Sequence, residues 1–220
     1  MTANQFDYRG VPIHIKKKPI KHMYIRIHAS GCHINMSNKL SAKFVENYLK
    51  DNIEAIKKTY LKLKHMTYSI LGKPISVSYS KDDYDYEFKR NHLKIAHPIS
   101  FDKGFKAFLK TSMITYIQHL EAQLQSHLKS FEITPVPYQF KYLTSKFGSY
   151  HRVKHMITLN TFLYMLEPAL IFYVLMHEYA HTKAFHHQQA FYDLQHRLCP
   201  NDKELSKRLK TLTIPRQFTI

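Results

Sequence analysis

The chain of 220 residues has no tryptophan, five glycines, two cysteines, and 16 acidic side chains against 33 basic ones. The two cysteines, Cys32 and Cys199, are too few for a disulfide framework, and neither lies in a paired metal-binding motif. We therefore expect both thiols to be reduced. The sequence also has no apolar run of about 18 residues and no signal-peptide pattern, so we expect a soluble cytoplasmic protein without a membrane span.

The composition predicts a folded protein with a basic surface. Hydrophobic residues make up 44% of the chain and aromatic residues 14%, which is typical of a globule with a core. The net charge of +17 predicts non-specific attraction to nucleic acid. The basic residues are spread along the chain, however, and no helix-turn-helix, zinc-finger or RNP pattern accompanies them. Solvated basic faces are the simpler interpretation, and no specific nucleic-acid site is indicated.

The most informative stretch, residues 168–187, contains His177-Glu178-x-x-His181. In a helix, positions i and i+4 share a face, so both imidazoles can reach one metal ion. Glu178 lies about 100° further round the helix axis, beside that metal rather than bound to it. Zn²⁺ lowers the pKa of its bound water from about 15.7 towards 7. The spacing therefore predicts a zinc hydrolase in which Glu178 is the general base.

The context of the motif decides between a metal site and coincidence. A chain with 16 histidines produces this pattern by chance with an expected count of about 0.04. Pro168 suits the first turn of a helix, and residues 169–176 are apolar on every side, as in a buried helix. A carboxylate and two imidazoles at the end of such a helix would be costly to bury without a partner, and a metal ion supplies one.

A catalytic zinc normally has three protein ligands and one open position. His187 follows His181 by six residues, beyond the expected helix end, and its neighbour His186 is a competitor for the third position. Only one of two consecutive side chains is expected to point at the metal. The periodicity of the sequence does not choose between them.

A family resemblance does choose. His177-Glu-Tyr-Ala-His181-x5-His187-x3-Phe191 resembles the pattern H-E-L-x-H-x5-H-x3-F-W of the YgjP-like metallopeptidases. This group consists of M48-type zincins related to the SprT-like and WLM metalloproteases. The resemblance implies that His187 is the third zinc ligand. It extends loosely over about residues 20–212.

A second segment, residues 146–160, resembles the family pattern R-W-G-S-C-S-x-x-G-x-I-x-L-N. Four positions match it: Gly148, Ser149, Leu159 and Asn160. Five positions in the two segments depart from the family pattern: Phe147 and Tyr192 replace Trp, Tyr150 replaces Cys, His155 replaces Gly, and Tyr179 replaces Leu. The loop that faces the substrate has therefore changed while the metal triad is intact.

The periodicities predict an α+β fold. An N-terminal lobe, residues 1–98, contains β-hairpins and two helices at 41–49 and 51–64. His97-Pro98 marks the expected boundary, because the residue before proline resists helix. Residues 99–220 then form a compact zincin-like lobe. Its expected elements are a long helix over 100–130, short antiparallel strands over 138–143, 147–150 and 156–159, the metal helix, and closing helices over 188–198 and 202–212.

These patterns lead to a zinc metallopeptidase acting on peptides or proteins, with residues 150–158 as the strand that an extended substrate would join. His151, Arg152 and His155 could polarise the scissile carbonyl or bind a phosphate there, although exposed hairpin positions explain them equally well. One alternative is a metal-dependent hydrolase of nucleotide phosphoanhydrides, which the absence of a Gly-rich phosphate loop disfavours. The other is a basic, non-enzymatic module that binds nucleic acid.

Overall fold

The computed structural model describes residues 4–28, 30–64 and 67–219. The chain forms two compact units: the first is built on the residues up to Thr67, and the second spans Tyr68–Phe218. Helices and several small β-sheets are combined in one chain, which confirms the predicted α+β class.

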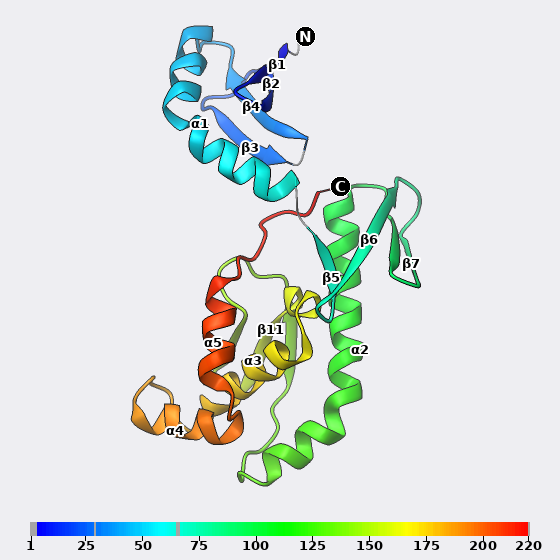
Figure 1. Cartoon of the computed structure of the whole chain (residues 1–220), viewed down its shortest axis with the longest axis vertical. Coiled ribbons are helices and arrows are strands. Elements are labelled where there is room, and N and C mark those ends of the chain that lie inside the picture. The colour runs from blue at the N-terminus through cyan, green and yellow to red at the C-terminus, as the bar shows by residue number, and fades with distance from the viewer. Residues whose placement is uncertain (1–3, 29, 65–66, 220) are drawn as a thin grey trace. The chain divides into compact units, whose positions relative to one another are not determined.

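The first unit is a four-stranded sheet with one helix (Figure 1). The strand order is β1-β2-β4-β3, in which β2 and β4 run parallel and the other neighbours antiparallel. Strand side chains alternate between a buried and a polar face, as the period of two requires. The elements are β1 (Asn4–Tyr8), β2 (Val11–Lys18), β3 (Tyr24–His28), β4 (Gly31–Ser37) and α1 (Ala42–Lys64).

The core of the first unit lies between the sheet and α1. The buried strand positions meet an apolar stripe on α1 that repeats every three or four residues: Val45, Leu49, Ile53, Ile56 and Tyr60. Helix α1 is continuous, so the expected break into two helices was wrong. Asp51 lies inside the helix as an exposed residue, and the stretch contains no glycine or proline that would end it.

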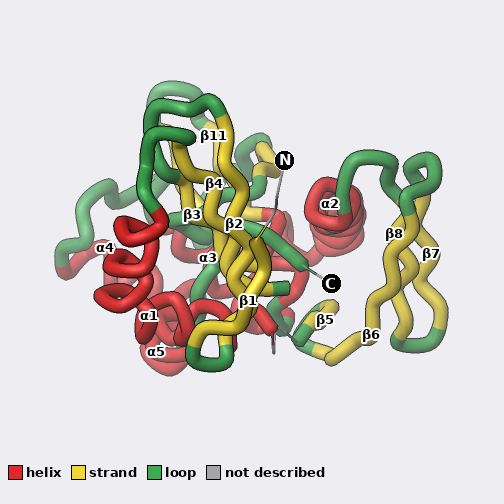
Figure 2. Tube along the Cα trace, turned by 90° about the horizontal axis from the view of Figure 1, so that it is seen from above, coloured by secondary structure: helices red, strands yellow, loops and turns green. Residues whose placement is uncertain are grey.

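The second unit begins with another four-stranded sheet, of order β5-β6-β8-β7, beside the long helix α2 (Phe101–Lys129). Figure 2 shows β6, β7 and β8 to one side of that helix. The Ser100 side chain caps α2 by accepting a hydrogen bond from the Lys103 amide. The strands are β5 (Tyr68–Ile70), β6 (Lys73–Ser80), β7 (Asp85–Lys89) and β8 (His92–Ala96).

Residues 68–96 belong to the second unit, whereas the predicted lobe boundary lay at residue 98. Aromatic packing explains why the second unit begins at Tyr68 rather than after residue 98, because the Tyr68 ring contacts the rings of Phe101 and Phe105 edge-on. The Ser69 hydroxyl also donates to the Met165 carbonyl at 2.6 Å. These contacts tie β5 to elements that come much later in the sequence.

The remaining elements of the second unit surround a three-stranded sheet of order β10-β11-β9. Strand β11 pairs antiparallel with β10 but parallel with β9, so the expectation of three antiparallel strands was wrong for β9. The elements are β9 (Tyr138–Lys141), β10 (Gly148–His151), β11 (Met156–Asn160), η1 (Thr161–Met165), α3 (Pro168–Ala180), α4 (Gln189–Leu198) and α5 (Asp202–Thr211). Among the residues that the structure describes, no helix is both long enough and apolar enough to span a membrane.

Candidate metal centre

Helix α3 carries the motif His177-Glu178-x-x-His181 in its last turn. Pro168 occupies the first turn, where its missing N–H costs nothing. Most side chains between Leu170 and Ala180 are buried, in agreement with a helix that is apolar on all sides. The helix ends at Ala180, and His181 is the C-terminal cap residue with helical backbone angles. His177 and His181 therefore keep the i, i+4 relation that the sequence predicts.

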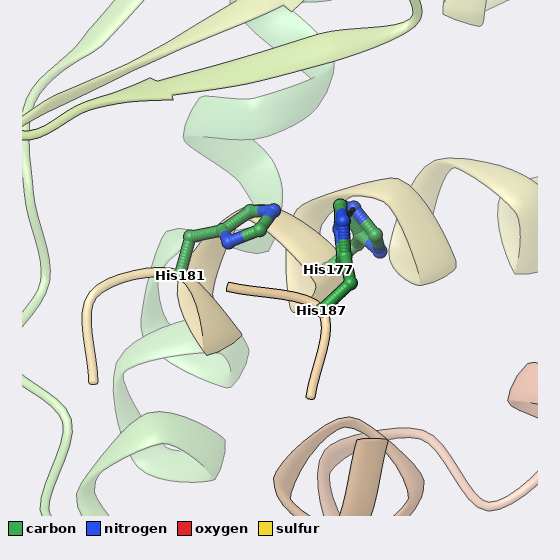
Figure 3. Close-up of side chains that lie close together, drawn as sticks. All are labelled: His177, His181 and His187. Atoms are coloured by element: carbon green, nitrogen blue, oxygen red, sulfur yellow. Dashed lines mark hydrogen bonds between the residues drawn. The ribbon is translucent and has the colours of Figure 1, made fainter. Parts of the chain in front are cut away.

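The structure brings together the three imidazoles that the sequence selects. Each of His177, His181 and His187 offers one ring nitrogen, and these nitrogens all lie within 4.8 Å of one another. Two of the side chains extend from α3 and the third from the loop that follows it (Figure 3). The Nε2 atoms of His177 and His187 are 3.4 Å apart. His186 is exposed on the same loop and does not belong to this group.

Hydrogen bonds orient two of these rings. The Nδ1 atom of His177 lies 2.8 Å from Oε1 of Gln195, and Nδ1 of His181 lies 3.3 Å from the carbonyl of Ala184. An oxygen acceptor at Nδ1 fixes the proton there and leaves the Nε2 lone pair for a metal ion. Burial, followed by the neighbouring His181, lowers the pKa of His177 to about 4, so the ring is neutral at pH 7. Neutral imidazoles with this arrangement fit a divalent metal ion.

Phe191 forms the apolar backing of the cluster. Its ring is fully buried on α4 and contacts all three imidazoles, with ring centroids 5.0 Å from His177, 4.5 Å from His181 and 4.6 Å from His187. An aromatic ring at this place restricts the rotamers of the three histidines and excludes water from one side of them. Phe191, four residues after His187, is therefore part of the candidate metal centre.

Glu178 follows His177 on α3, and its side chain meets strand β10 while lining the same cleft as the three histidines. Its side chain is buried, and Oε2 accepts a hydrogen bond of 2.7 Å from the Tyr150 amide. Burial raises the pKa of the Glu178 carboxyl to about 7, against the opposing effects of the Tyr150 amide and Lys146. A Cβ atom at Gly148 would lie 2.7 Å from Oε1 of Glu178. The absence of a side chain at Gly148 is what lets the carboxylate approach the strand.

A cleft of about 340 Å³ opens above the histidines and Glu178. One part of its lining is formed by Tyr150, Arg152 and Phe185. The Arg152 guanidinium lies 4.2 Å from the centre of the Phe185 ring, and the Tyr150 ring stacks on Phe185 with centroids 6.2 Å apart. A cation and two aromatic rings therefore border the candidate catalytic groups.

The strand predicted to receive an extended substrate is only partly available. Strand β11 is the central strand, paired on both edges, so residues 156–158 have no open edge. Strand β10 lies at the edge of the sheet, beside Glu178. His151 accepts a hydrogen bond from the Lys154 amide in the hairpin turn, and neither His151 nor His155 lines the cleft. Of the three polar side chains that the sequence offers here, the cleft includes Arg152.

Comparison with known proteins agrees with this geometry. The model of the YgjP-like metallopeptidase domain matches residues 21–212. The chain belongs to the YgjP-like metallopeptidase family. No curated protein matches it. Among solved structures, the metallopeptidase zymogen abylysin of Pyrococcus abyssi is similar at 24% identity and a TM-score of 0.39, covering 47% of this chain and 99% of its own. The metallopeptidase zymogen jannalysin of Methanocaldococcus jannaschii is similar at 19% identity and a TM-score of 0.35. The match covers 42% of this chain and 97% of jannalysin.

Family membership implies a metal ion and a hydrolase. Three of the five positions that depart from the YgjP-like pattern lie in hydrogen-bonded pairs: Tyr150, His155 and Tyr179. Tyr179, fully buried on α3, is hydrogen-bonded through its hydroxyl to that of Tyr138 on β9. Tyr150 is bonded in the same way to Nδ1 of His155, at 3.0 Å. His155 has a φ of 44°, the left-handed conformation that the usual glycine adopts readily. Tyr138 lies outside the two family segments, whereas Tyr150 and His155 both lie in the segment 146–160.

Two further residues of the site have no signal in the sequence. Gln195 lies 18 residues after the His177 that it orients, and Phe185 lies in the irregular loop between α3 and α4. Neither occupies a position that helix periodicity relates to the metal motif. Asn160, by contrast, belongs to the matched segment 146–160. Its buried amide bonds the backbone of Leu143, Lys146 and Phe162, and so fixes the loop that leads into β10.

Proposed function

We propose that this chain is a zinc-dependent metallopeptidase that hydrolyses peptide bonds. The observation that carries the proposal is the convergence of three imidazole nitrogens within 4.8 Å, beside the buried Glu178 and in an open cleft. Three nitrogen ligands with an accessible fourth position are typical of catalytic zinc sites. Family membership supports a metallopeptidase, and the three imidazoles support zinc as its metal.

His177, His181 and His187 would hold the metal. When bound, zinc supplies a water of lowered pKa and polarises the scissile carbonyl. Glu178 would accept a proton from the attacking water and pass it to the nitrogen of the leaving amine as the peptide C–N bond breaks. Oε2 of Glu178 is occupied by the Tyr150 amide, so we assign the proton transfer to Oε1. The hydrogen bond from Tyr150 holds the carboxylate in one orientation throughout.

An extended peptide would lie along β10, the edge strand nearest to Glu178. Strand addition supplies main-chain hydrogen bonds, and the side chains beside the strand select among substrates. Arg152 and Phe185 lie on that side of the cleft. The segment proposed to bind the substrate is therefore β10 and the start of the turn after it, rather than all of residues 150–158.

The proposal is tested by replacing Glu178 with Gln in the zinc-loaded chain. Gln has nearly the same shape but cannot accept the proton, so we expect hydrolysis of casein-type protein substrates to fall by at least about 100-fold while zinc is retained. Glu54→Gln, at an exposed position of α1, is the matched control and should retain full activity. Full hydrolysis by the Glu178→Gln variant would refute the general-base assignment.

Nucleoside triphosphates are assayed beside the protein substrates in the same preparations. We expect no turnover of nucleotides that depends on Glu178. Nucleotide hydrolysis that is lost in Glu178→Gln, with protein substrates left intact by the wild-type chain, would replace the peptidase proposal with a phosphoanhydride hydrolase.

A further inference from the structure

Within the described residues of the first unit, the sheet has one face that α1 does not cover, and that face is basic. Helix α1 packs on the other side, against the buried strand residues. Asp7 on β1 is exposed on this face. Its other exposed side chains include Gln5 on β1, Lys16 on β2, and Tyr24 and Arg26 on β3, with β4 between β2 and β3. Tyr24 is 53% exposed, which is unusual for a large aromatic side chain in a sheet.

The strand register aligns these side chains in two rows across the sheet. One row runs from Gln5 through His14 and His33 to Arg26, crossing all four strands. The imidazoles of His14 and His33 stack within this row, with centroids 4.3 Å apart and an interplanar angle of 8°. The second row runs from Lys16 through Asn35 to Tyr24. Aromatic and cationic groups therefore share one face of the sheet, which we call the basic sheet face.

The charge of this surface is segregated along the sequence. From Tyr8 to Val45 the chain contains no aspartate or glutamate, but it contains eight basic residues: Arg9, Lys16, Lys17, Lys18, Lys21, Arg26, Lys39 and Lys43. The one carboxylate of the sheet strands, Asp7, accepts a hydrogen bond from the Gly10 amide at a turn. No carboxylate of the four strands stands in either row.

We propose that the basic sheet face binds single-stranded nucleic acid. Lysine and arginine side chains pair with successive phosphates, and an exposed aromatic ring stacks on an unpaired base without reading its identity. A duplex hides the faces of its bases, so the exposed ring of Tyr24 favours a single strand over a duplex. Strands β1 and β2, which contribute half of the sheet, lie outside the residues 21–212 that match the family.

The first test measures binding of a fluorescent oligothymidine of about 20 nucleotides to the full chain by anisotropy, over a range of salt concentrations. The double variant Lys16→Ala, Arg26→Ala removes two charges from the basic sheet face. The matched control Lys50→Ala, Lys58→Ala removes two exposed charges from α1 on the opposite side. We expect affinity to fall at least about tenfold in the first variant and less than about twofold in the control. The slope of log affinity against log salt should decrease by about 1.4 in the first variant alone.

The second test isolates stacking from charge. Tyr24→Leu should weaken binding at least about fivefold without changing the salt slope, whereas Tyr24→Phe should bind as the wild type. Phe44→Leu is the control, because Phe44 is exposed to a similar extent, 47%, on α1. A duplex of the same length should bind more weakly than the single strand.

Several results would overturn the proposal. Equal losses in the two double variants would mean that the charge acts diffusely rather than at this face. Equal affinity for duplex and single strand, or no effect of Tyr24→Leu, would remove stacking from the account. Binding to vesicles of phosphatidylserine that depends on Lys16 and Arg26, with none to oligonucleotides, would make the face a membrane surface instead.

Discussion

At the scale of single residues, the candidate metal site depends on hydrogen-bond acceptors that set the tautomer of the imidazole rings. Gln195 and the Ala184 carbonyl accept from Nδ1 of His177 and His181, and this leaves the Nε2 lone pair of each ring available to a metal ion. The spacing of His177, Glu178 and His181 could be predicted because helix geometry alone relates them. The choice of His187 over His186 required the family resemblance, since both lie in a loop without periodicity. Gln195 could not be predicted, because its contact with His177 arises only when α4 packs on α3.

Removal of the Gln195 side chain should weaken metal binding. In Gln195→Ala the Nδ1 proton of His177 loses its acceptor, so the ring can rotate and change tautomer, and we expect zinc affinity to fall about 10- to 100-fold. Competition with a zinc-binding dye measures the effect. Gln189→Ala, an exposed position on the same helix, should leave the affinity unchanged. Wild-type affinity in Gln195→Ala would mean that the Nδ1 hydrogen bond does not matter.

Both cysteines should be inert in the folded protein. Cys32 is fully buried, and burial raises the pKa of its thiol to about 11; burial raises the pKa of Cys199 as well. Since only the thiolate reacts, a chromogenic disulfide at pH 8 should label neither thiol in the native chain and both after denaturation. Asn38→Cys, at an exposed turn, provides a reactive control. Rapid labelling of native wild type would contradict the structure around these residues.

At the scale of elements, strand β10 supports the candidate catalytic carboxylate. The Tyr150 amide of this strand donates a hydrogen bond to Glu178, and the absence of a side chain at Gly148 leaves room for the carboxylate. The position of this strand was predicted to within one residue, since residues 147–150 were expected and Gly148–His151 is observed. Its partner arrangement was not, because the parallel pairing of β9 with β11 depends on the path of the chain over residues 142–155 rather than on either strand's sequence. The continuity of α1 was missed for a related reason, since a polar residue that could cap a helix also fits its exposed face.

Replacing Gly148 with alanine should separate metal binding from catalysis. The added Cβ would lie 2.7 Å from Oε1 of Glu178 and 3.0 Å from Cγ1 of Val174, so the carboxylate or the strand must shift. We expect a loss of about 1–3 kcal/mol in stability, typical of overpacking, together with at least about a tenfold loss of kcat. Zinc content should remain at the wild-type level, because the atoms nearest to the added Cβ belong to Glu178 and Val174 rather than to the three histidines. Unchanged kcat would mean that Glu178 does not need its place beside β10.

At the scale of the whole molecule, the chain combines two compact units with different chemistry. The second unit contains the candidate metal centre, and the first contains the basic sheet face. The α+β class could be predicted from the sequence, since strand and helix periods are distinct. The division at Thr67 could not, because it follows from packing of Tyr68 against rings that are more than 30 residues away in the sequence.

Removal of the metal should affect the second unit selectively. A ligand that binds only the folded state stabilises it, so chelation should accelerate hydrogen exchange in the segments that contact the site. We expect faster exchange in β10 and in residues 177–195, with strands β2 and β4 as an internal control whose exchange stays constant. Mass spectrometry of peptides from the zinc-loaded and chelated chain measures this. Uniform acceleration in both units would show that the metal stabilises the protein elsewhere.

The most direct test is the metal content of tag-free protein, measured by elemental analysis on chains never exposed to nickel resin. The wild type and His186→Ala should each contain one zinc ion per chain, whereas His181→Ala and His187→Ala should contain none. His186→Ala is the matched control, because it removes a neighbouring imidazole that lies outside the cluster. Absence of metal from the wild type after loading with zinc, or loss of metal in His186→Ala with retention in His187→Ala, would contradict the account.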